Sequence, residues 1–355
     1  MRRLLELWRR LDFQPGKPHS SNPHVQRVRR RVERDYLFGR FSRTYRLLLV
    51  CGLKATWWPR AIGHSIRAFS KDGVAVERAY RLTRLTQFKQ ILMLALREGV
   101  PPSAYYRLDL YREENRRRAC DFIFRHEIVF FLRRPARAEL VHDKYLFAQW
   151  CAGHGWPHPS ILAYSQAGRV IWEAEPGRTE LSFLAKPRRG SRGAGIVSLE
   201  GTSDQVRRGF VALGSGADLI LQSKIEPPQG WIEAPVLRFV STPENVVLDY
   251  QTRGEAVQAA TLSAARELVA MAHRELADFP ALGWDVIVGK NGPVLLEANL
   301  GWDVETPQRL FGPLADFEQL LGDSCTADEM GLAVQPQQQI IGHGHRIGSE
   351  SGRQS

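Results

Sequence analysis

The chain has 355 residues, 43% of them apolar, enough for one large buried core or two moderate ones. Its four cysteines are scattered without a C-x-x-C pair, which argues against a disulfide framework or zinc site and suits a reducing cytoplasm. The longest apolar run, Leu47 to Leu53, is too short to span a bilayer, and the first residues lack a signal-peptide core. We therefore expect a cytoplasmic protein.

The formal net charge of +11 is unevenly distributed along the chain. Residues 1–140 contain 31 Lys and Arg against 13 Asp and Glu, whereas residues 141–355 contain 18 against 25. We expect the basic part and the acidic part to do different jobs.

Residues 1–60 form a basic, Arg-rich segment, in which residues 26–34 precede a mixture of Leu, Trp and Arg between Tyr45 and Trp58. The favoured interpretation is a solvated helical face whose apolar stripe packs on the main body. The sharper alternative is a basic helix that contacts an anionic membrane peripherally, at its inner face. Nucleic acid is not expected, because no RRM, KH or OB signature accompanies the basic residues.

Residues 61–140 are expected to form a helical N-terminal domain. Apolar residues from Val74 to Glu98 recur every three or four positions, a helical pattern that Gly99 and Pro101-Pro102 end. The stripe consists of Leu82, Leu85, Phe88, Leu92, Ala95 and Leu96. A charged helix over residues 112–118 and an apolar run over 122–132 follow.

From Asp143 the pattern changes to alternating strands and helices. Asp143 is suited to cap a helix over residues 144–152. Further expected elements are a hairpin over 161–172, strands over 181–187, 196–197, 218–224, 234–241 and 246–250, and helices over 202–213 and 261–277. After Met330 the chain is rich in Gln, Gly, His and Ser, and we expect residues 331–355 to be a disordered tail.

A second hairpin is predicted between Gly283 and Asn299, with a three-residue turn Lys290-Asn291-Gly292. The apolar residues that alternate along it are Val286, Val288, Val294, Leu296 and Ala298. This register places Asp285 directly opposite Glu297, with Cβ atoms about 5 Å apart. Asn299 follows Glu297 by two residues and points to the same face.

Two opposed carboxylates repel each other unless a cation lies between them. With the amide oxygen of Asn299, Asp285 and Glu297 form a hard-oxygen cluster of the kind that binds Mg²⁺ or Mn²⁺. The competing interpretation is a solvated hairpin face whose acids are neutralised by Lys290 or by an arginine.

The strand that ends in Lys186 leads into a loop of small residues and arginines, residues 188–195. Glycines let backbone N–H groups close over an anion, and Lys186 adds a positive charge at the loop's mouth. The loop matches neither a Walker P-loop nor a dinucleotide-binding motif, so a mobile surface hairpin is an equal alternative.

The order of these motifs resembles the ATP-grasp superfamily over residues 140–310, and its sugar-transfer-associated branch in particular. The motifs are Asp143-Lys144, Lys186-Pro187 with Gly190, Gly193 and Gly195, Leu221 to Glu226, Arg238, and Gly283-Trp284-Asp285 with Leu296 to Asn299. The resemblance implies an α+β ATP-grasp fold over residues 141–325, in which two α+β subdomains clasp ATP behind a basic helical N-terminal region.

The resemblance also implies a role for each matching residue. Lys144 and Lys186 would hold the ATP phosphates, and Arg238 would meet the γ-phosphate, Lys186 and Arg238 being the catalytic pair. The lid loop would contain Gly190, Ser191, Gly193 and Gly195, together with Arg188, Arg189 and Arg192 as further phosphate contacts. The adenine and ribose slot would contain Gln222, Ser223, Lys224, Ile225 and Glu226. The magnesium ligands would be Asp285, Glu297 and Asn299.

We therefore expect an ATP- and Mg²⁺-dependent ligase that activates a carboxylate as an acyl phosphate and passes it to an amine, or less favourably to a thiol. By resemblance, its substrate belongs to sugar or polysaccharide synthesis for the cell envelope. One alternative is a phosphotransferase on the same fold. Another is a basic nucleic-acid- or membrane-binding protein with a degenerate nucleotide site. Trp302, Asp303 and Gln308 either face the substrate or belong to ordinary loop packing.

Overall fold

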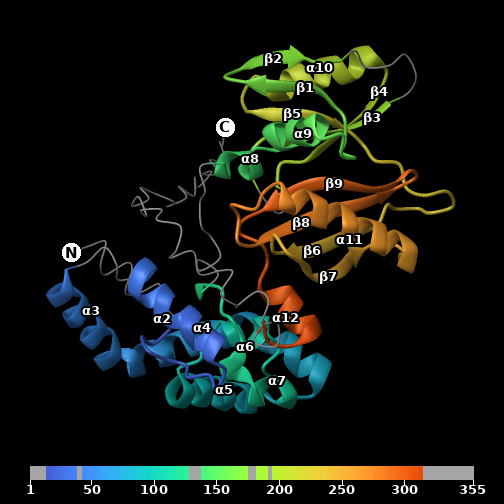
Figure 1. Cartoon of the computed structure of the whole chain (residues 1–355). Coiled ribbons are helices and arrows are strands. Elements are labelled where there is room, and N and C mark those ends of the chain that lie inside the picture. Colours follow the sequence, from blue (N-terminus) through green and yellow to red (C-terminus); the bar gives the residue numbers. More distant parts are fainter. Residues whose placement is uncertain (1–12, 38–41, 128–136, 175–180, 191–193, 315–355) are drawn as a thin grey trace, which may run out of the picture.

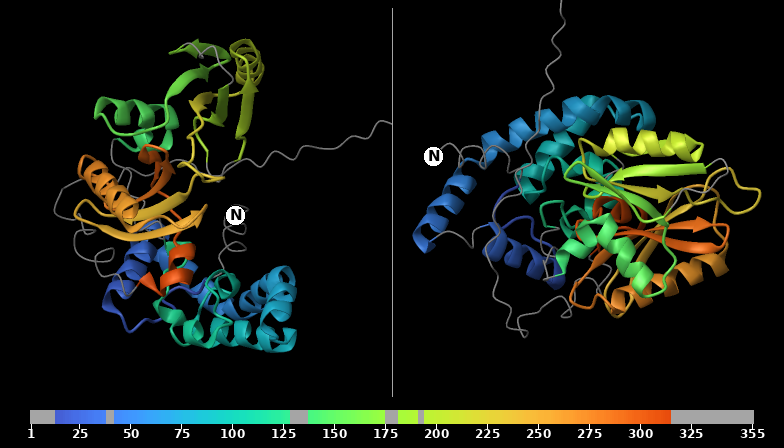
Figure 2. Two further views of the ribbon diagram at one scale, coloured as in Figure 1. Left: turned by 90° about the vertical axis from the view of Figure 1, so that its right-hand side faces the viewer. Right: turned by 90° about the horizontal axis from the view of Figure 1, so that it is seen from above.

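The computed structural model describes residues 13–37, 42–127, 137–174, 181–190 and 194–314, and the expected tail over 331–355 lies outside this range. The described chain forms three tiers: a helical region and two antiparallel sheets, each sheet with helices packed on it (Figures 1 and 2). The expected α+β class with a helical N-terminal region is confirmed. The domain boundaries expected from the sequence stay predictions.

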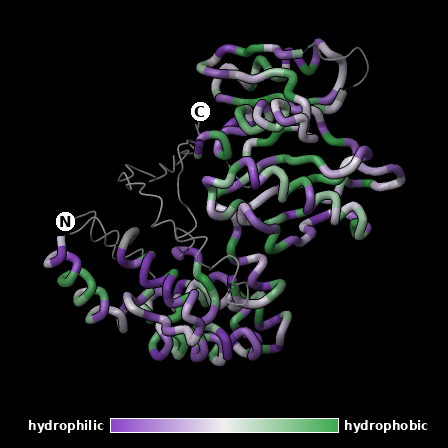
Figure 3. Tube along the Cα trace, in the orientation of Figure 1, coloured by the Kyte–Doolittle hydropathy of each residue, from purple (hydrophilic) through white to green (hydrophobic). Residues whose placement is uncertain are grey.

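The helical region contains most of the basic residues. Hydrophilic residues line much of this region, whereas hydrophobic stretches run along the strands of the two sheets (Figure 3). Its elements are α2 (Pro23–Arg31), η1 (Val32–Leu37), α3 (Arg43–Ala55), α4 (Trp57–Tyr80), α5 (Arg84–Met93), η2 (Leu94–Glu98), α6 (Ala104–Arg107), α7 (Glu113–Arg117) and η3 (Ala119–Asp121). No helix within the described ranges is long and apolar enough to cross a membrane.

The expected continuous helix from Val74 to Glu98 is wrong, because the chain turns between α4 and α5. Arg81 adopts a left-handed conformation with φ of 54° and ends α4. The Gln87 side chain donates to the backbone carbonyls of Gly73, at 3.1 Å, and Leu82, at 2.7 Å, and holds the two helices together. Consequently Gln87 is buried, whereas Leu85 of the expected apolar stripe is 64% exposed.

The Arg-rich segment contains a buried arginine that the expectation of a solvated face missed. Val25, Val28 and Val32 form the expected apolar stripe and are buried. Arg29 lies beside them, with its Nε 2.7 Å from the Glu127 carboxylate and its Nη atoms donating to three backbone carbonyls. The segment therefore uses one of its charges to hold the fold together.

The first sheet has the strand order β2-β1-β5-β3-β4, and all neighbouring strands are antiparallel. α10 (Ser203–Gly214) packs on one face through Val206 and Phe210. The strands are β1 (Ile161–Gln166), β2 (Arg169–Trp172), β3 (Leu181–Pro187), β4 (Val197–Gly201) and β5 (Leu219–Ser223).

The second sheet has the order β7-β6-β8-β9, and α11 (Ala259–Arg274) covers one of its faces. Its strands are β6 (Val236–Ser241), β7 (Val246–Arg253), β8 (Leu282–Gly289) and β9 (Gly292–Asn299). The helices α8 (Ala138–His142) and α9 (Lys144–Gly153) share the core under α11 through Val141 and Phe147. α12 (Glu305–Phe311) follows β9 and packs against the helical region.

The second hairpin reaches the predicted register by an unexpected route. Its turn contains two residues, Lys290 and Asn291, and Gly292 opens β9 with φ of 108°. A bulge after Asp285 adds one residue to β9, so Asp285 still pairs with Glu297. The bulge also turns Leu295 into the core in place of Leu296, which corrects the expected alternation.

Candidate functional site

A row of polar residues crosses the second sheet from strand to strand. Tyr250 on β7 pairs with Arg238 on β6, Arg238 pairs with Asp285 on β8, and Asp285 pairs with Glu297 on β9. The flanking residues that pack under α11 are Leu237, Phe239, Trp284, Val286 and Ala298. Because side chains alternate along a strand, Arg238, Asp285 and Glu297 point to the face opposite α11.

The Asp285 carboxylate of this row is affected by burial, by Arg238 and by Glu297. Burial raises the pKa of Asp285 to about 7; Arg238 opposes this rise, and the neighbouring Glu297 carboxylate adds to it. Arg238 Nε lies 3.0 Å from Asp285 Oδ1. An arginine therefore neutralises Asp285, as the competing interpretation of the hairpin expected. Lys290 does not serve this purpose, since it pairs with Glu226 at 2.6 Å.

Asn299 completes the oxygen cluster. Its Nδ2 donates to Glu297 Oε1 at 3.1 Å, so both side chains lie on the predicted face. Among the described residues there is no cluster of three His, Cys, Asp or Glu side chains, so a metal here would rely on two carboxylates and this amide oxygen. Hard oxygen donors and a carboxylate whose pKa is raised by burial and by its acidic neighbour fit a divalent cation such as Mg²⁺.

Two lysines from other elements lie near the acids. Lys144, the first residue of α9, lies with its Nζ 3.5 Å from Glu297 Oε2 and donates to the backbone carbonyl of Gly190 at 2.8 Å. Lys186 comes from the end of β3 in the first sheet. Burial lowers the pKa of the Lys186 ammonium, an effect that the Glu297 carboxylate partly offsets. The Lys186 side chain makes no hydrogen bond or ion pair with another described residue, so this partly buried cation is available to an anion.

The loop after β3 is described only in part. Gly190 and Gly195 adopt positive φ angles of 141° and 76°, which favour glycine. Ser191, Arg192 and Gly193 lie outside the described residues. Arg188 is not available as a phosphate contact, because its Nη2 forms an ion pair with Oδ2 of the buried Asp143 at 2.7 Å. Asp143 caps α9 at the same time, so Arg188 holds the loop base to the helix that carries Lys144.

The segment expected to hold adenine connects the two sheets. Gln222 is buried in β5, and Ser223 exchanges hydrogen bonds with Ser160. Lys224 points away toward Glu200 on β4, at 3.8 Å. A Cβ added to Gly289 would lie 2.7 Å from Ile225, and Glu226 pairs with Lys290, so this connection lies against the turn end of the second hairpin.

Of the three residues expected either to face the substrate or to belong to loop packing, Trp302 and Gln308 are buried, whereas Asp303 is exposed. Gln308 is fully buried and forms hydrogen bonds with both backbone groups of Ile123, at 2.8 Å each. Asp303 accepts hydrogen bonds from the backbone N–H groups of Glu305 and Thr306 at the start of α12, and its charge acts on Arg238 and Tyr250 of the polar row. Trp302 belongs to a buried cluster with α2 and lies against Gly283, where no Cβ would fit.

Two residues near the site were missed from the sequence. Tyr250 lies beside Arg238, and burial raises the pKa of its hydroxyl to about 12. Arg253, at the end of β7, adds positive potential near Lys186. Counting residue pairs back from Ser241 and Val246 at the turn would place Asp249 opposite Arg238. A bulge between Val240 and Ser241 shifts the register, so Arg238 pairs with Tyr250.

No family model matches the sequence, and no curated protein matches it. Among solved structures, a D-alanine–D-alanine ligase from Helicobacter pylori is similar at 14% identity and a TM-score of 0.41, covering 52% of this chain and 58% of that one. An ATP-grasp protein with a RimK domain from Sphaerobacter thermophilus is similar at 20% identity and a TM-score of 0.37, covering 53% and 69%. N5-carboxyaminoimidazole ribonucleotide synthetase from Thermotoga maritima is similar at 15% identity and a TM-score of 0.34, covering 46% and 42%. Likeness at this level assigns no activity.

Proposed function

We propose that this protein is an ATP- and Mg²⁺-dependent ligase of the ATP-grasp type, with residues 141–325 as its catalytic domain. The observation that supports this most is the row Arg238–Asp285–Glu297, with Asn299 beside it and Lys144 and Lys186 nearby. Acidic oxygens for a divalent cation and lysines for phosphates are brought together from two sheets and α9. Phosphoryl transfer needs this combination of positioning and charge neutralisation.

In this proposal, Lys144 and Lys186 bind the phosphates, and Arg238 neutralises the charge that develops on the transferred group. Asp285, Glu297 and Asn299 hold Mg²⁺, which would supply charge neutralisation between the phosphates when bound. The residues of Gln222 to Glu226 border the adenine and ribose. The carboxylate substrate becomes an acyl phosphate, an amine attacks its carbonyl carbon, and phosphate leaves. A thiol acceptor is the less favoured form.

The sequence resemblance further supports a sugar- or polysaccharide-linked substrate of envelope or exopolysaccharide synthesis. A phosphotransferase on the same fold is the alternative. The two are separated by the product: a ligase releases ADP and phosphate and leaves an amide, whereas a phosphotransferase leaves phosphate on its product. Phosphorus NMR and mass spectrometry of a reaction supplied with carboxylate and amine candidates would distinguish them.

The experiment that tests the nucleotide site is calorimetric titration with ATP in the presence and absence of Mg²⁺. Wild-type protein should bind ATP in a Mg²⁺-dependent manner, and both Lys186→Ala and Asp285→Ala/Glu297→Ala should lose this binding. The matched controls Lys89→Ala and Glu255→Ala/Glu267→Ala remove the same charges from exposed positions outside the site and should bind normally. Equal binding by all variants would overturn the proposal, and salt-sensitive RNA binding without ATP binding would favour a degenerate site.

We also propose a peripheral contact of the N-terminal helices with an anionic membrane surface. Large apolar side chains are exposed on α3 and the first half of α4: Leu47 (64%), Leu48 (66%), Trp58 (64%), Ile62 (40%) and Ile66 (50%). They lie in the basic part of the chain, the combination that favours an anionic lipid surface. Leu48→Asp/Trp58→Asp should abolish co-sedimentation with vesicles containing phosphatidylglycerol. The control Leu310→Asp alters an exposed apolar residue of α12 and should leave it intact; equal sedimentation of all three proteins would contradict this contact.

A further inference from the structure

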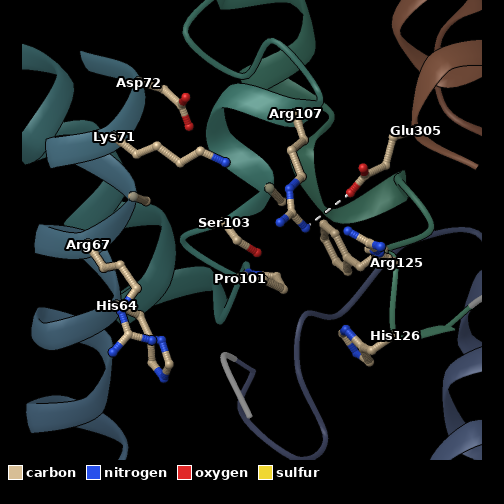
Figure 4. A pocket seen from close by; sticks show the side chains of 13 residues that line it. His64, Arg67, Lys71, Asp72, Pro101, Ser103, Arg107, Arg125, His126 and Glu305 are labelled. Atoms are coloured by element: carbon tan, nitrogen blue, oxygen red, sulfur yellow. Dashed lines mark hydrogen bonds and ion pairs between the residues drawn. The ribbon is translucent and has the colours of Figure 1, made fainter. Parts of the chain in front are cut away.

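The helical region contains a surface pocket of about 520 Å³ that the proposed ligase chemistry does not use. It lies between α4 on one side and α6, the segment before it and residues 124–126 on the other (Figure 4). The residues that line it are His64, Arg67, Ala68, Lys71, Asp72, Pro101, Ser103, Ala104, Arg107, Phe124, Arg125, His126 and Glu305.

The side chains of α4 that line the pocket are spaced like those of a helix face that packs on a neighbour, but they include charged residues where apolar ones are usual. Arg67 and Ala68 follow His64 by three and four residues, and Lys71 follows Arg67 by four. The four residues therefore occupy one stripe of the helix. A stripe turned toward a neighbouring element is ordinarily apolar. Here it includes two cations one turn apart, which repel each other unless an anion lies between or above them.

Within the described ranges, the side chains of Arg67 and Lys71 make no hydrogen bond or ion pair. Figure 4 shows Lys71 reaching from α4 toward Arg107 and Ser103. On that far wall, Arg107 pairs with Glu305 at 3.4 Å. The charges of Arg125 and Arg107 both act on the Glu305 carboxylate. The lining thus contains four Lys and Arg side chains against two acids, of which one is already paired.

The remaining lining is apolar and small. Phe124, 2% exposed, and the buried Pro101 form the floor of the pocket, and Ala68 and Ala104 contribute only small side chains to its walls. A ligand that satisfies both walls needs a strongly anionic group and an organic part. Arginine and lysine together favour phosphate, because guanidinium binds two of its oxygens and the ammonium adds a point charge.

We propose that this pocket binds an organic phosphate, with the phosphate dianion held between Lys71 and Arg107, Arg67 adding positive charge at the side of the pocket next to His64, and the organic part over the floor that Phe124 and Pro101 form. The site is distinct from the candidate nucleotide site on the second sheet, and the proposal does not depend on the ligase activity.

Phenyl phosphate is a suitable probe, since it combines a dianion with a small apolar group. In calorimetric titration of the full chain at 0.15 M salt, wild-type protein should bind it saturably and bind benzoate more weakly. Arg67→Ala/Lys71→Ala should weaken binding about tenfold or more, because the charge-assisted contact of Lys71 and the neighbouring charge of Arg67 are both lost. Both side chains are exposed and make no hydrogen bond or ion pair in the part of the chain that the structure describes, so this variant should fold normally.

Three further proteins make the assignment specific. Arg78→Ala/Lys89→Ala removes two exposed cations of α4 and α5 outside the pocket and should change the affinity less than about twofold. Ala68→Phe fills the pocket without removing a charge and should also weaken binding. Lys186→Ala should retain phenyl phosphate binding even where it loses ATP.

The proposal is overturned if wild-type protein shows no saturable binding, or if benzoate binds more tightly than phenyl phosphate. It is also overturned if the matched control loses as much affinity as the pocket variant, or if Lys186→Ala alone loses the probe. The last result would place the probe in the nucleotide site. Failure of ATP binding in all proteins leaves the phosphate measurement interpretable, so the two proposals fail separately.

Discussion

The helical region and the second sheet each contain an arginine–carboxylate pair, and the two pairs differ in how completely they are satisfied. Arg29 and Glu127 are 6% and 3% exposed, and three backbone carbonyls and one backbone N–H complete their hydrogen bonds. Arg238 and Asp285 are 39% and 16% exposed, with a second carboxylate directly beside them. The first pair holds elements together, whereas the second leaves oxygen donors available for a further cation.

The largest expected effect comes from breaking the buried Arg29–Glu127 pair. Arg29→Met should lower the free energy of unfolding by about 3–5 kcal/mol, because Glu127 is left charged and buried without its partner. Urea denaturation at pH 7 measures this loss. Arg117→Met, which removes an exposed arginine that pairs with Glu113, is the control and should change stability by less than about 0.5 kcal/mol. A loss below about 1 kcal/mol for Arg29→Met would contradict the structural role.

His273, in the core of the second sheet, also has hydrogen-bond partners for both ring nitrogens, and we expect its role to be structural. His273 lies between the Ser241 hydroxyl at 2.6 Å and the Phe279 carbonyl at 2.9 Å, and burial lowers its pKa from 6.5 to about 4. The imidazole stays neutral in the folded chain but binds a proton in the unfolded chain below pH 6.5. Its contribution is therefore complete above pH 6.5 and is lost as the pH falls toward 4, by roughly 2–3 kcal/mol at pH 4.5.

Comparison with His273→Gln isolates this contribution, since the variant does not titrate. Unfolding free energies at pH 7 and pH 4.5 should fall more steeply for wild type than for His273→Gln. If both proteins lose the same stability, the acid sensitivity comes from other groups.

Glu297, the carboxylate beside the Arg238–Asp285 pair, should respond in the opposite way to Arg29. Glu297→Gln removes one of two opposed carboxylates and should change the free energy of unfolding by less than about 1 kcal/mol. The same change should weaken Mg²⁺-dependent ATP binding about tenfold or more. Urea denaturation and calorimetry on the same preparation measure both quantities. A large loss of stability with unchanged ATP affinity would make this row a structural feature like Arg29 and Glu127.

The smallest effect is expected at the exposed end of the second hairpin. Lys290 and Glu226 are 56% and 69% exposed, so Lys290→Ala should change stability by less than about 0.5 kcal/mol. Thermal unfolding at low and high salt measures this change. A larger, salt-independent loss would show that the turn depends on this pair.

Sequence patterns predicted the strands and helices of residues 143–299 closely, because each has local signals. Asp143 caps α9 as expected, and β3 begins and ends at the predicted residues. The helical region was predicted less well: at the break near Arg81, the Gln87 side chain donates to the carbonyl of Gly73 inside α4 and to that of Leu82 between α4 and α5. A polar side chain that is buried by its hydrogen bonds interrupts the apolar periodicity from which helices are recognised.

The sequence by itself determined that Asp285 faces Glu297, that Asn299 joins them, and that the basic and acidic residues are separated along the chain. Only the tertiary structure decided which charges are already paired. Arg188 lies in the loop expected to bind phosphate but forms an ion pair with Asp143. The side chains of Lys186 and Lys71 make no ion pair or hydrogen bond among the described residues. The reason is physical: spacing along the chain determines the face on which a side chain lies, but its partner comes from a distant segment that packing brings near.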